Sequence, residues 1–393
     1  MESNGNPTMK RVLHVLYSLE RSGMEMMLLS SNAEWRDRGY ECDVLATAES
    51  VGPLAEQMRA CGYAVHHLPF RSWLSLLPRF DFVRRFFLLC HSGFDIVHIH
   101  SEAGSPLFAL IAWLAGVQRI AVTPHNTFRF CGLLRIRKLC ERHIVRLLGG
   151  RFGMISDGVS ACEWERFRNK GVRIRNWFSA ARFTSPVPLE RAAVRQSLGA
   201  RPEDFVIVSV GNCNAAKNHQ AILRAIPLLP AVLQPLYVHI GREQPDHPEQ
   251  KLADTLGILD KVRFLGSQAE VLPFLWAADV FVMPSLHEGL GIAALEAAAS
   301  GVPLVCSQVD GLSDIAAATN NTILTGTTPQ SIATGIARVA VLPLAERRNR
   351  ALADGRLVRE FFSIHNGVQS IIAGLYADDT QSPPIIEKVW RQS

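Results

Sequence analysis

The sequence lacks the cysteine patterns that mark metal-binding and disulfide-rich proteins. Its eight cysteines are scattered over 393 residues, with no C-x-x-C pair and no His/Cys cluster at the spacing of metal ligands. Isolated cysteines of this kind are typical of reduced thiols, which are mostly buried because they behave as small hydrophobic side chains. Because disulfides are rare in the cytoplasm, the pattern favours a cytoplasmic protein.

Long hydrophobic runs are absent too. The longest apolar stretch, residues 106–117, is too short to cross a bilayer and instead predicts a helix in the protein core. Residues 1–9 are polar, so we expect no secretory signal peptide. Together these absences predict a cytoplasmic protein, either free or held peripherally at the inner face of a membrane.

Charged residues are few and unevenly distributed. Only 20% of the residues are charged and 48% are hydrophobic, which predicts a folded chain with a large core, long enough for two domains. Residues 1–190 contain 24 Lys and Arg against 17 Asp and Glu, a net +7, whereas the remainder contains 17 against 19, a net −2. We therefore expect the basic first half to meet an anionic surface.

Residues 279–303 have the most regular pattern in the chain. Residues 279–284 form a short apolar run ended by proline, which is typical of a strand buried on both faces of a parallel sheet. A loop with two glycines, residues 285–291, comes next. Residues 292–299 are rich in alanine and predict a helix that stops before Gly301. The stretch is therefore expected to fold as strand, glycine loop and helix.

Two carboxylates, Glu288 and Glu296, suggest the chemistry of this stretch. Glu288 precedes the predicted helix, whose amino-terminal N–H groups favour an anion such as phosphate. Glu296 follows about two turns later, so the two side chains are expected on nearly the same face. This layout suits a sugar nucleotide, which carries hydroxyl groups on both sides of a pyrophosphate. The plainer interpretation, two solvated glutamates, stays open here because acidic residues at this spacing are common.

The whole stretch resembles the signature of glycosyltransferase family 4, P-S-x-x-E-G-x-G-x-x-x-L-E-A-x-A-x-G-x-P-V. The resemblance implies a GT-B fold, and it implies that Glu288 contacts the sugar hydroxyls and Glu296 the ribose. It also places the loop formed by Gly289, Leu290 and Gly291 beside the pyrophosphate. Leu304 stands where the signature has valine, and the matching positions are Pro284, Ser285, Glu288, Gly289, Gly291, Leu295, Glu296, Ala297, Ala299, Gly301 and Pro303.

The first half contains two further elements that resemble the family. Residues 22–25 are similar to the G-G-x-E element, whose glycines let the backbone approach donor and acceptor; Gly23 is kept and Ser22 replaces the first glycine. His125, after a predicted strand at residues 119–123, matches the histidine that reaches the donor sugar and the phosphate. A glycine turn alone is equally typical of an ordinary helix start, so the role of Gly23 depends on the resemblance.

Two other histidines precede His125. His98 and His100 lie in the predicted strand at residues 95–100 and point to alternate faces of it. Our expectation for both is a hydrogen-bonded histidine of the core.

Lys217 matches the lysine of the family's G-R-L-x-x-x-K element, which neutralises the donor pyrophosphate. A lysine at a helix start is otherwise usually solvated. Asn212 stands in place of the arginine of that element, and losing this charge would weaken donor binding and stabilisation of the leaving group. Either another basic residue, such as Arg242, substitutes for it, or catalysis is slower than usual.

The resemblance assigns a set of site residues and no metal. No D-x-D motif occupies a suitable place, so we expect no cofactor, and the leaving pyrophosphate would be balanced by Lys217 and the helix amino terminus. The predicted catalytic residues are Glu288, His125 and Lys217. The predicted donor-binding residues are Gly23, Asn212, Lys217, Gly289, Leu290, Gly291 and Glu296.

Strands and helices alternate in both halves of the chain, which predicts an α/β protein with doubly wound parallel sheets. The resemblance implies two Rossmann-like domains facing across a cleft, with residues 1–183 binding the acceptor and residues 201–360 the nucleotide sugar. Residues 184–200 are the predicted linker. Residues 361–379 are expected to form a helix that crosses back to the first domain.

Two basic segments, residues 71–89 and 127–152, mix arginine with leucine and phenylalanine. Amphipathic helices of this kind bind anionic lipid head groups. An equally valid interpretation is a helix that packs its leucines on the sheet and solvates its arginines. Nucleic acid is not expected as a partner because no nucleic-acid-reading motif accompanies the charge.

The sequence therefore predicts a retaining glycosyltransferase that moves a hexose from a nucleotide diphosphate sugar, of the UDP or GDP type, to an acceptor hydroxyl. The basic first domain suggests a glycan or lipid-linked acceptor at an anionic membrane surface, as in polysaccharide biosynthesis. Two alternatives stay open: a sugar-nucleotide 2-epimerase with the same fold, and a sugar-nucleotide-binding protein without catalytic activity.

Overall fold

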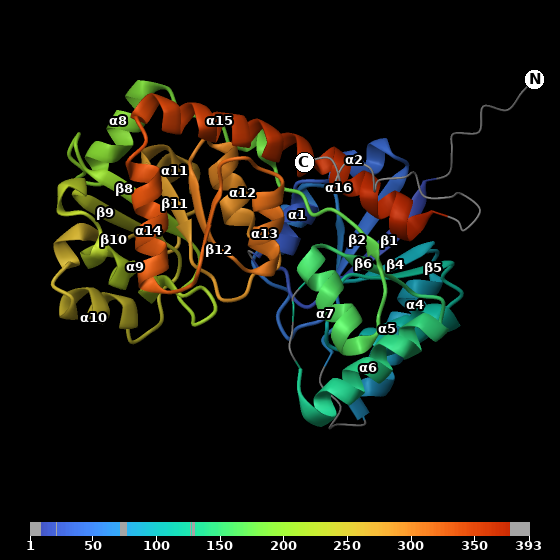
Figure 1. The fold of residues 1–393 in the computed structure, drawn as a ribbon. Coiled ribbons are helices and arrows are strands. Elements are labelled where there is room, and N and C mark those ends of the chain that lie inside the picture. Colours follow the sequence, from blue (N-terminus) through green and yellow to red (C-terminus); the bar gives the residue numbers. More distant parts are fainter. Residues whose placement is uncertain (1–8, 21, 71–76, 126, 128–129, 378–393) are drawn as a thin grey trace, which may run out of the picture. The chain divides into compact units, whose positions relative to one another are not determined.

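The computed structural model describes residues 9–20, 22–70, 77–125, 127 and 130–377, and the side chains of residues 77–79 are left aside. The chain forms two compact units (Figure 1). The first contains the chain up to Trp177 together with the segment from Ile364, and the second contains Phe178–Ser363.

The first unit is built on a seven-stranded parallel sheet with the strand order β3-β2-β1-β4-β5-β6-β7. Strand β4 is buried along its whole length, as expected when helices cover both faces of a parallel sheet. The strands are β1 Lys10–Leu16, β2 Tyr40–Ala46, β3 Ala64–His67, β4 Ile96–Ile99, β5 Arg119–Val122, β6 Arg151–Met154 and β7 Val172–Arg173. The helices are α1 Gly23–Leu29, α2 Asn32–Asp37, α3 Ala55–Ala60, α4 Leu77–His91, α5 Ser105–Leu114, α6 Gly132–Leu147, α7 Asp157–Phe167 and α16 Ile364–Ile371.

The second unit repeats this plan with a six-stranded parallel sheet in the order β10-β9-β8-β11-β12-β13. The strands are β8 Phe205–Val210, β9 Pro235–Ile240, β10 Val262–Phe264, β11 Val280–Met283, β12 Leu304–Ser307 and β13 Ile323–Thr325. The helices are α8 Pro188–Ser197, α9 His219–Ala225, α10 Pro248–Thr255, α11 Leu272–Ala277, α12 Ile292–Ala299, α13 Asp310–Ala317, α14 Pro329–Ala340 and α15 Leu344–Phe361. Short 3-10 turns occupy Ala180–Arg182, Ile226–Leu228, Ala231–Leu233 and Leu259–Lys261, and a π-turn, Ile372–Tyr376, ends α16 in the first unit.

Strand β11 lies in the middle of the second sheet and divides its core in two. Successive side chains of a strand point to opposite faces. Phe281 and Met283 accordingly pack into the hydrophobic cluster on one face, and Val280 and Val282 into the cluster on the other. All four are buried, which explains why this segment is an unbroken apolar run in the sequence.

The amino-terminal end of β11 is anchored by a buried carboxylate. Asp279 accepts hydrogen bonds from Arg191 at 2.8 Å and from Arg195 at 2.9 Å, and Arg347 lies 3.4 Å away. It also accepts from the backbone N–H of Val206 at 2.9 Å. Asp279 thus ties β11 to β8, α8 and α15, and it compensates three guanidinium groups at once.

Two elements differ from what the local sequence pattern predicts. The apolar stripe of residues 24–38 predicts a single helix, but the chain forms two, α1 and α2, because the hydroxyls of Ser30 and Ser31 donate to the carbonyls of Met27 and Leu28 and compete with the helical pattern. Residues 154–160 are predicted to form a strand, but strand β6 ends at Met154.

In place of the rest of that strand the chain forms α7. Ser156 caps this helix, accepting from the N–H of Val159 at 3.0 Å. Serine is a favoured cap residue and Asp157 suits the positive end of the helix, so this pair was the available signal.

The two compact units show where the chain passes from one to the other. The first unit ends at Trp177, six residues before the predicted end at 183, and α8 occupies Pro188–Ser197 within the predicted linker. The chain returns to the first unit at Ile364, where α16 begins. None of the described helices is both long and apolar enough to cross a membrane.

Candidate active site

The loop after β11 carries the central pair of the site. The Nζ atom of Lys217 lies 2.5 Å from Oε2 of Glu288, and the hydroxyl of Ser285 donates to the same oxygen at 3.3 Å. Both members of the pair are partly exposed. The carboxyl ends of β8 and β11 are neighbours in the sheet, so the loops that follow them bring the two charges together.

Gly291 is required by the shape of this loop. Its φ of +78° is a left-handed conformation that side chains disfavour, and an added Cβ would lie 2.5 Å from Cδ2 of Leu312. Helix α13, which carries Leu312, therefore presses directly against the loop. The backbone N–H of Gly311 also donates to the carbonyl of Glu288 at 3.3 Å, which fixes the backbone beneath that carboxylate.

The amino terminus of α12 faces this loop. Gly291 is its cap residue and has no side chain to occupy the first N–H groups of the helix. Those groups carry the positive end of the helix dipole, which favours a bound anion. An anion here would lie next to Lys217, so two independent sources of positive potential meet at one place.

Glu296 lies in the second turn of α12 and is half-buried. Burial raises the pKa of its carboxyl to about 7; Arg182 opposes this shift and Glu270 adds to it. Arg182 is itself paired with Glu270 through bonds of 2.8 and 2.7 Å. Glu296 therefore titrates close to neutral pH, and a ligand that donates hydroxyl hydrogen bonds would bind its ionised form.

The two carboxylates are held differently from what the spacing suggested. Glu288 lies in the loop three residues before the cap of α12, so it does not share a helical face with Glu296. Among the described residues, neither belongs to a group of His, Cys, Asp or Glu side chains close enough to hold a metal ion.

Asn212, at the position of the family's arginine, contacts the backbone of Arg242, which lies two residues after the end of β9. Its side-chain Oδ1 accepts from the backbone N–H of Arg242 at 2.9 Å, and the carbonyl of Arg242 accepts from the N–H of Cys213 at 2.9 Å. Gly241 permits this approach, because a Cβ there would lie 2.1 Å from the carbonyl oxygen of Gly211. The guanidinium of Arg242 is exposed and forms no ion pair with another described residue. Asn212 thus fixes the backbone of an exposed arginine just after β9, the strand beside β8.

The site residues of the first unit lie at the carboxyl ends of its strands. Ser22 precedes α1 and its hydroxyl donates to the carboxylate of Glu25, a bond that the glycine of the family pattern could not form. Burial raises the pKa of Glu25, and the bond from Ser22 opposes that rise. Gly23 is the first residue of α1 and is exposed.

His125 follows β5 and is half-buried. Burial lowers the pKa of its imidazole to about 4, so the ring is neutral near pH 7. Its Nε2 lies 3.0 Å from Nδ1 of His100, which leaves Nδ1 of His125 as the nitrogen for a ligand. Asn126, the next residue, lies outside the described part of the chain.

Comparison with known proteins decides the family. The family model described as "Glycosyl transferases group 1" matches residues 190–356, and the "Glycosyl transferase 4-like domain" matches residues 22–211. The chain is a group 1 glycosyltransferase of family 4. It is therefore a transferase enzyme, and residues 22–356 are accounted for by the two matches together.

Curated relatives of this glycosyltransferase include the putative glycosyltransferase EpsF of Bacillus subtilis, 27% identical over 317 residues that cover 77% of this chain and 80% of EpsF. Another is D-inositol 3-phosphate glycosyltransferase 2 of Catenulispora acidiphila, 27% identical over 290 residues that cover 64% of this chain and 63% of the relative.

Solved structures confirm the GT-B fold of the glycosyltransferase. Anabaena HepE, in complex with UDP and glucose, superposes with a TM-score of 0.77 at 17% identity, covering 92% of this chain and 98% of HepE. WaaG, a glycosyltransferase involved in lipopolysaccharide biosynthesis, superposes with a TM-score of 0.67 at 17% identity, covering 92% and 100%. The predicted pair of Rossmann-like domains is thus confirmed.

Two positioning residues of this glycosyltransferase were not among the predicted site residues, although Ser285 belongs to the matched signature. Ser285 donates to Glu288, and Asn218 donates to the carbonyls of Pro284 and Thr327, each at 3.1 Å. Asn218 adopts a left-handed backbone conformation with φ 56°, which asparagine tolerates better than most residues. An asparagine immediately after Lys217 was the available signal.

Proposed function

We propose that this glycosyltransferase moves a hexose from a nucleotide diphosphate sugar, of the UDP or GDP type, to an acceptor hydroxyl with retention of configuration. The single observation that carries the proposal is the 2.5 Å pair between Lys217 and Glu288 at the amino terminus of α12. HepE, which shares the fold, has been crystallised with UDP and glucose, and this supports a nucleotide sugar as donor.

Without a donor, Lys217 and Glu288 compensate each other. A pyrophosphate at the amino terminus of α12 offers Lys217 a more highly charged partner, and the carboxylate of Glu288 then becomes available to sugar hydroxyls. As the bond from the sugar to the phosphate breaks, its electron pair leaves with the nucleotide diphosphate, where Lys217 and the helix N–H groups stabilise it. The acceptor oxygen attacks from the same face and its proton passes to the leaving phosphate. No metal is required in this scheme.

The test of this function is a panel of UDP and GDP sugars. We expect one donor to raise the melting temperature and to be hydrolysed slowly without acceptor. Mass analysis then separates the alternatives: an epimerase would return an isomeric sugar nucleotide, and a non-catalytic protein would bind a donor without any turnover. Either result would refute the transferase proposal for that donor.

We propose that Arg242 supplies the cation that Asn212 removes from the family pattern. Replacing Arg242 with alanine is expected to weaken nucleotide diphosphate binding by about 10- to 100-fold, since a hydrogen bond to a charged group contributes about 1.5–3 kcal/mol. Calorimetric titration with UDP and GDP measures the effect. Arg224, an exposed arginine of α9, is the matched control, and R224A should bind like the wild type. Equal affinities for R242A and R224A would refute the role of Arg242.

The acceptor is proposed to be lipid-linked and reached at an anionic membrane surface. Helix α6 presents apolar residues to solvent: Leu133 and Leu147 are 85% and 87% exposed. Two of its cations, Lys138 and Arg142, are buried and paired with acidic residues, whereas its other three, Arg135, Arg137 and Arg146, are exposed beside these leucines. Helix α5, which packs on α6, adds the exposed Trp113. An apolar surface in a basic domain is typical of peripheral membrane binding.

Substituting L133E and L147E together is expected to reduce the fraction of protein that sediments with phosphatidylglycerol vesicles several-fold, because both charges would have to be desolvated in the lipid interface. The control is V232E, since Val232 is 88% exposed in the second unit. Unchanged sedimentation of the double variant, or equal loss in the control, would contradict the assignment of this surface.

A further inference from the structure

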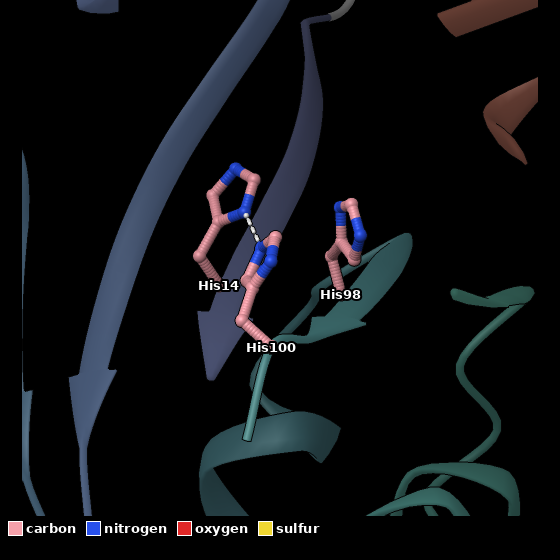
Figure 2. A group of neighbouring side chains, drawn as sticks. All are labelled: His14, His98 and His100. Atoms are coloured by element: carbon pink, nitrogen blue, oxygen red, sulfur yellow. Dashed lines mark hydrogen bonds between the residues drawn. The ribbon is translucent and has the colours of Figure 1, made fainter. Parts of the chain in front are cut away.

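Four histidines gather at the carboxyl ends of the central strands of the first unit. His14 lies in β1 opposite His98 of β4, His100 follows β4, and His125 follows β5. His14 and His98 are completely buried. Figure 2 shows His14, His98 and His100 close together, with a hydrogen bond between His14 and His100. Nothing in the proposed transfer requires three additional histidines here.

Three of the four rings form an unbroken chain of hydrogen bonds. Nδ1 of His14 lies 3.0 Å from Nε2 of His100, and Nδ1 of His100 lies 3.0 Å from Nε2 of His125. His98 is outside this chain, because its nitrogens bond to the hydroxyls of Tyr376 at 2.7 Å and Thr123 at 2.8 Å. The chain ends at the histidine whose remaining nitrogen is available to a ligand.

The three rings carry one proton each. Burial lowers the pKa of His14 to about 3 and of His125 to about 4, and it lowers the pKa of His100 well below its usual value. Every ring is therefore neutral near pH 7 and has one N–H donor and one bare acceptor nitrogen. Two bonds in series then allow only two arrangements. Either every ring carries its proton on Nδ1, or every ring carries it on Nε2.

The buried end of the chain selects between the two arrangements. Nε2 of His14 is buried and has no partner among the described residues. Orphaned N–H groups are rarer in protein interiors than orphaned acceptors, which favours a bare nitrogen at this position. The indole N–H of Trp35 is also buried without a described partner, and its ring centroid lies 5.9 Å from that of His14. No hydrogen bond joins these two groups, but an N–H donor near the His14 ring favours a bare Nε2 over a second N–H.

We propose that His14 and His100 are positioning residues that hold His125 as its Nδ1–H tautomer, so that a neutral imidazole presents an N–H donor to an oxygen of the donor substrate. The inference rests on the proposed function and on the role that the family resemblance implies for His125, contact with the donor sugar and phosphate. Free imidazole side chains in water favour the Nε2–H tautomer, which would leave a bare nitrogen facing those oxygens. The chain thus selects the form that can donate.

A metal site is the competing use of these rings, since ligand nitrogens of His14, His98 and His100 lie within 4.8 Å of one another. Five of their six ring nitrogens already take part in hydrogen bonds. A metal ion would therefore have to displace bonds that the proton chain retains.

The decisive experiment is NMR of the full chain labelled with ¹⁵N-histidine, recorded without substrate. His125 is assigned by its loss in H125Q. We expect the Nδ1–H tautomer in the wild type and the same tautomer in H100Q, because the amide of the introduced glutamine can accept from His14 and donate to His125. H100L should shift His125 toward Nε2–H and lower kcat/KM for the donor roughly ten-fold. The control H98L removes a neighbouring, completely buried ring outside the chain and should leave the tautomer unchanged.

An Nε2–H tautomer in the wild type, or no change in H100L, would overturn the proposal. A change of the histidine spectrum on adding Zn²⁺ would overturn it in favour of a metal site. Because the tautomer is observed without substrate, these outcomes are distinct from failure of the proposed transferase activity. If H100L does not fold, the wild-type tautomer and H100Q still decide the question.

Discussion

Replacing Lys217 with alanine is expected to lower kcat by about 100- to 1,000-fold, the usual cost of removing one group that stabilises charge developing in a transition state. Lys217 forms an ion pair with Glu288, and the loops after β8 and β11 hold the two together at the amino terminus of α12. The stability of the unliganded protein should hardly change, because partly exposed ion pairs contribute only about 0–1 kcal/mol.

Replacing Glu288, the partner of Lys217, should change the affinity for a nucleotide diphosphate in the opposite direction. K217A should weaken binding of a bare nucleotide diphosphate, since it removes a cation from the phosphate site. E288Q should lower turnover but strengthen that same binding slightly, because it frees Lys217 from its 2.5 Å ion pair. Calorimetry with UDP and GDP measures both affinities, and K261A, at an exposed lysine beside β10, serves as the control. Affinity changes of the same sign in K217A and E288Q would contradict the proposed competition between carboxylate and phosphate.

Replacing Asp279 with asparagine is expected to destabilise the second unit by about 3–5 kcal/mol, the cost of breaking a buried ion pair and leaving charge uncompensated. The amide introduced by D279N would keep the shape of the side chain and leave Arg191, Arg195 and Arg347 without their shared carboxylate. Burial already lowers the pKa of Arg191 to about 10, and the neighbouring arginines act in the same direction. Urea unfolding measures the loss.

The matched control for this substitution is D246N, at an exposed aspartate of the same unit without an ion pair among the described residues. D279N should retain nucleotide affinity at low temperature, because Asp279 immediately precedes β11 whereas the loop that carries Glu288 follows the other end of the strand. If the free energy of unfolding of D279N falls by less than about 1 kcal/mol, the scale of an exposed ion pair, then other groups compensate the charges of the arginines.

Much of the fold was predictable because its signals are local. The apolar run of β11, the glycines of the loop and the alanines of α12 occur in sequence order, and α12 begins and ends where the pattern placed it, at Ile292 and Ala299. Breaks caused by side-chain hydrogen bonds were not predictable in the same way. Ser30 and Ser31 divide a helix whose apolar pattern continues across them.

Contacts between residues far apart in the sequence could not be predicted from the sequence alone. His98 and His100 were expected to be hydrogen-bonded core histidines, and both form such bonds. However, the chain from His14 to His125 joins three strands, and strand order decides which side chains meet. The backbone contact between Asn212 and Arg242 likewise depends on β8 lying beside β9. Such proximities follow from the topology and not from spacing along the chain.

A crystal structure with a bound UDP or GDP sugar would test the proposed donor site at the level of single contacts. The pyrophosphate should lie at the amino terminus of α12, Lys217 should have exchanged its contact with Glu288 for a phosphate oxygen, and Glu288 and Glu296 should contact sugar and ribose hydroxyls. A donor bound elsewhere, or a Lys217–Glu288 pair left intact beside it, would contradict the assignment of this site.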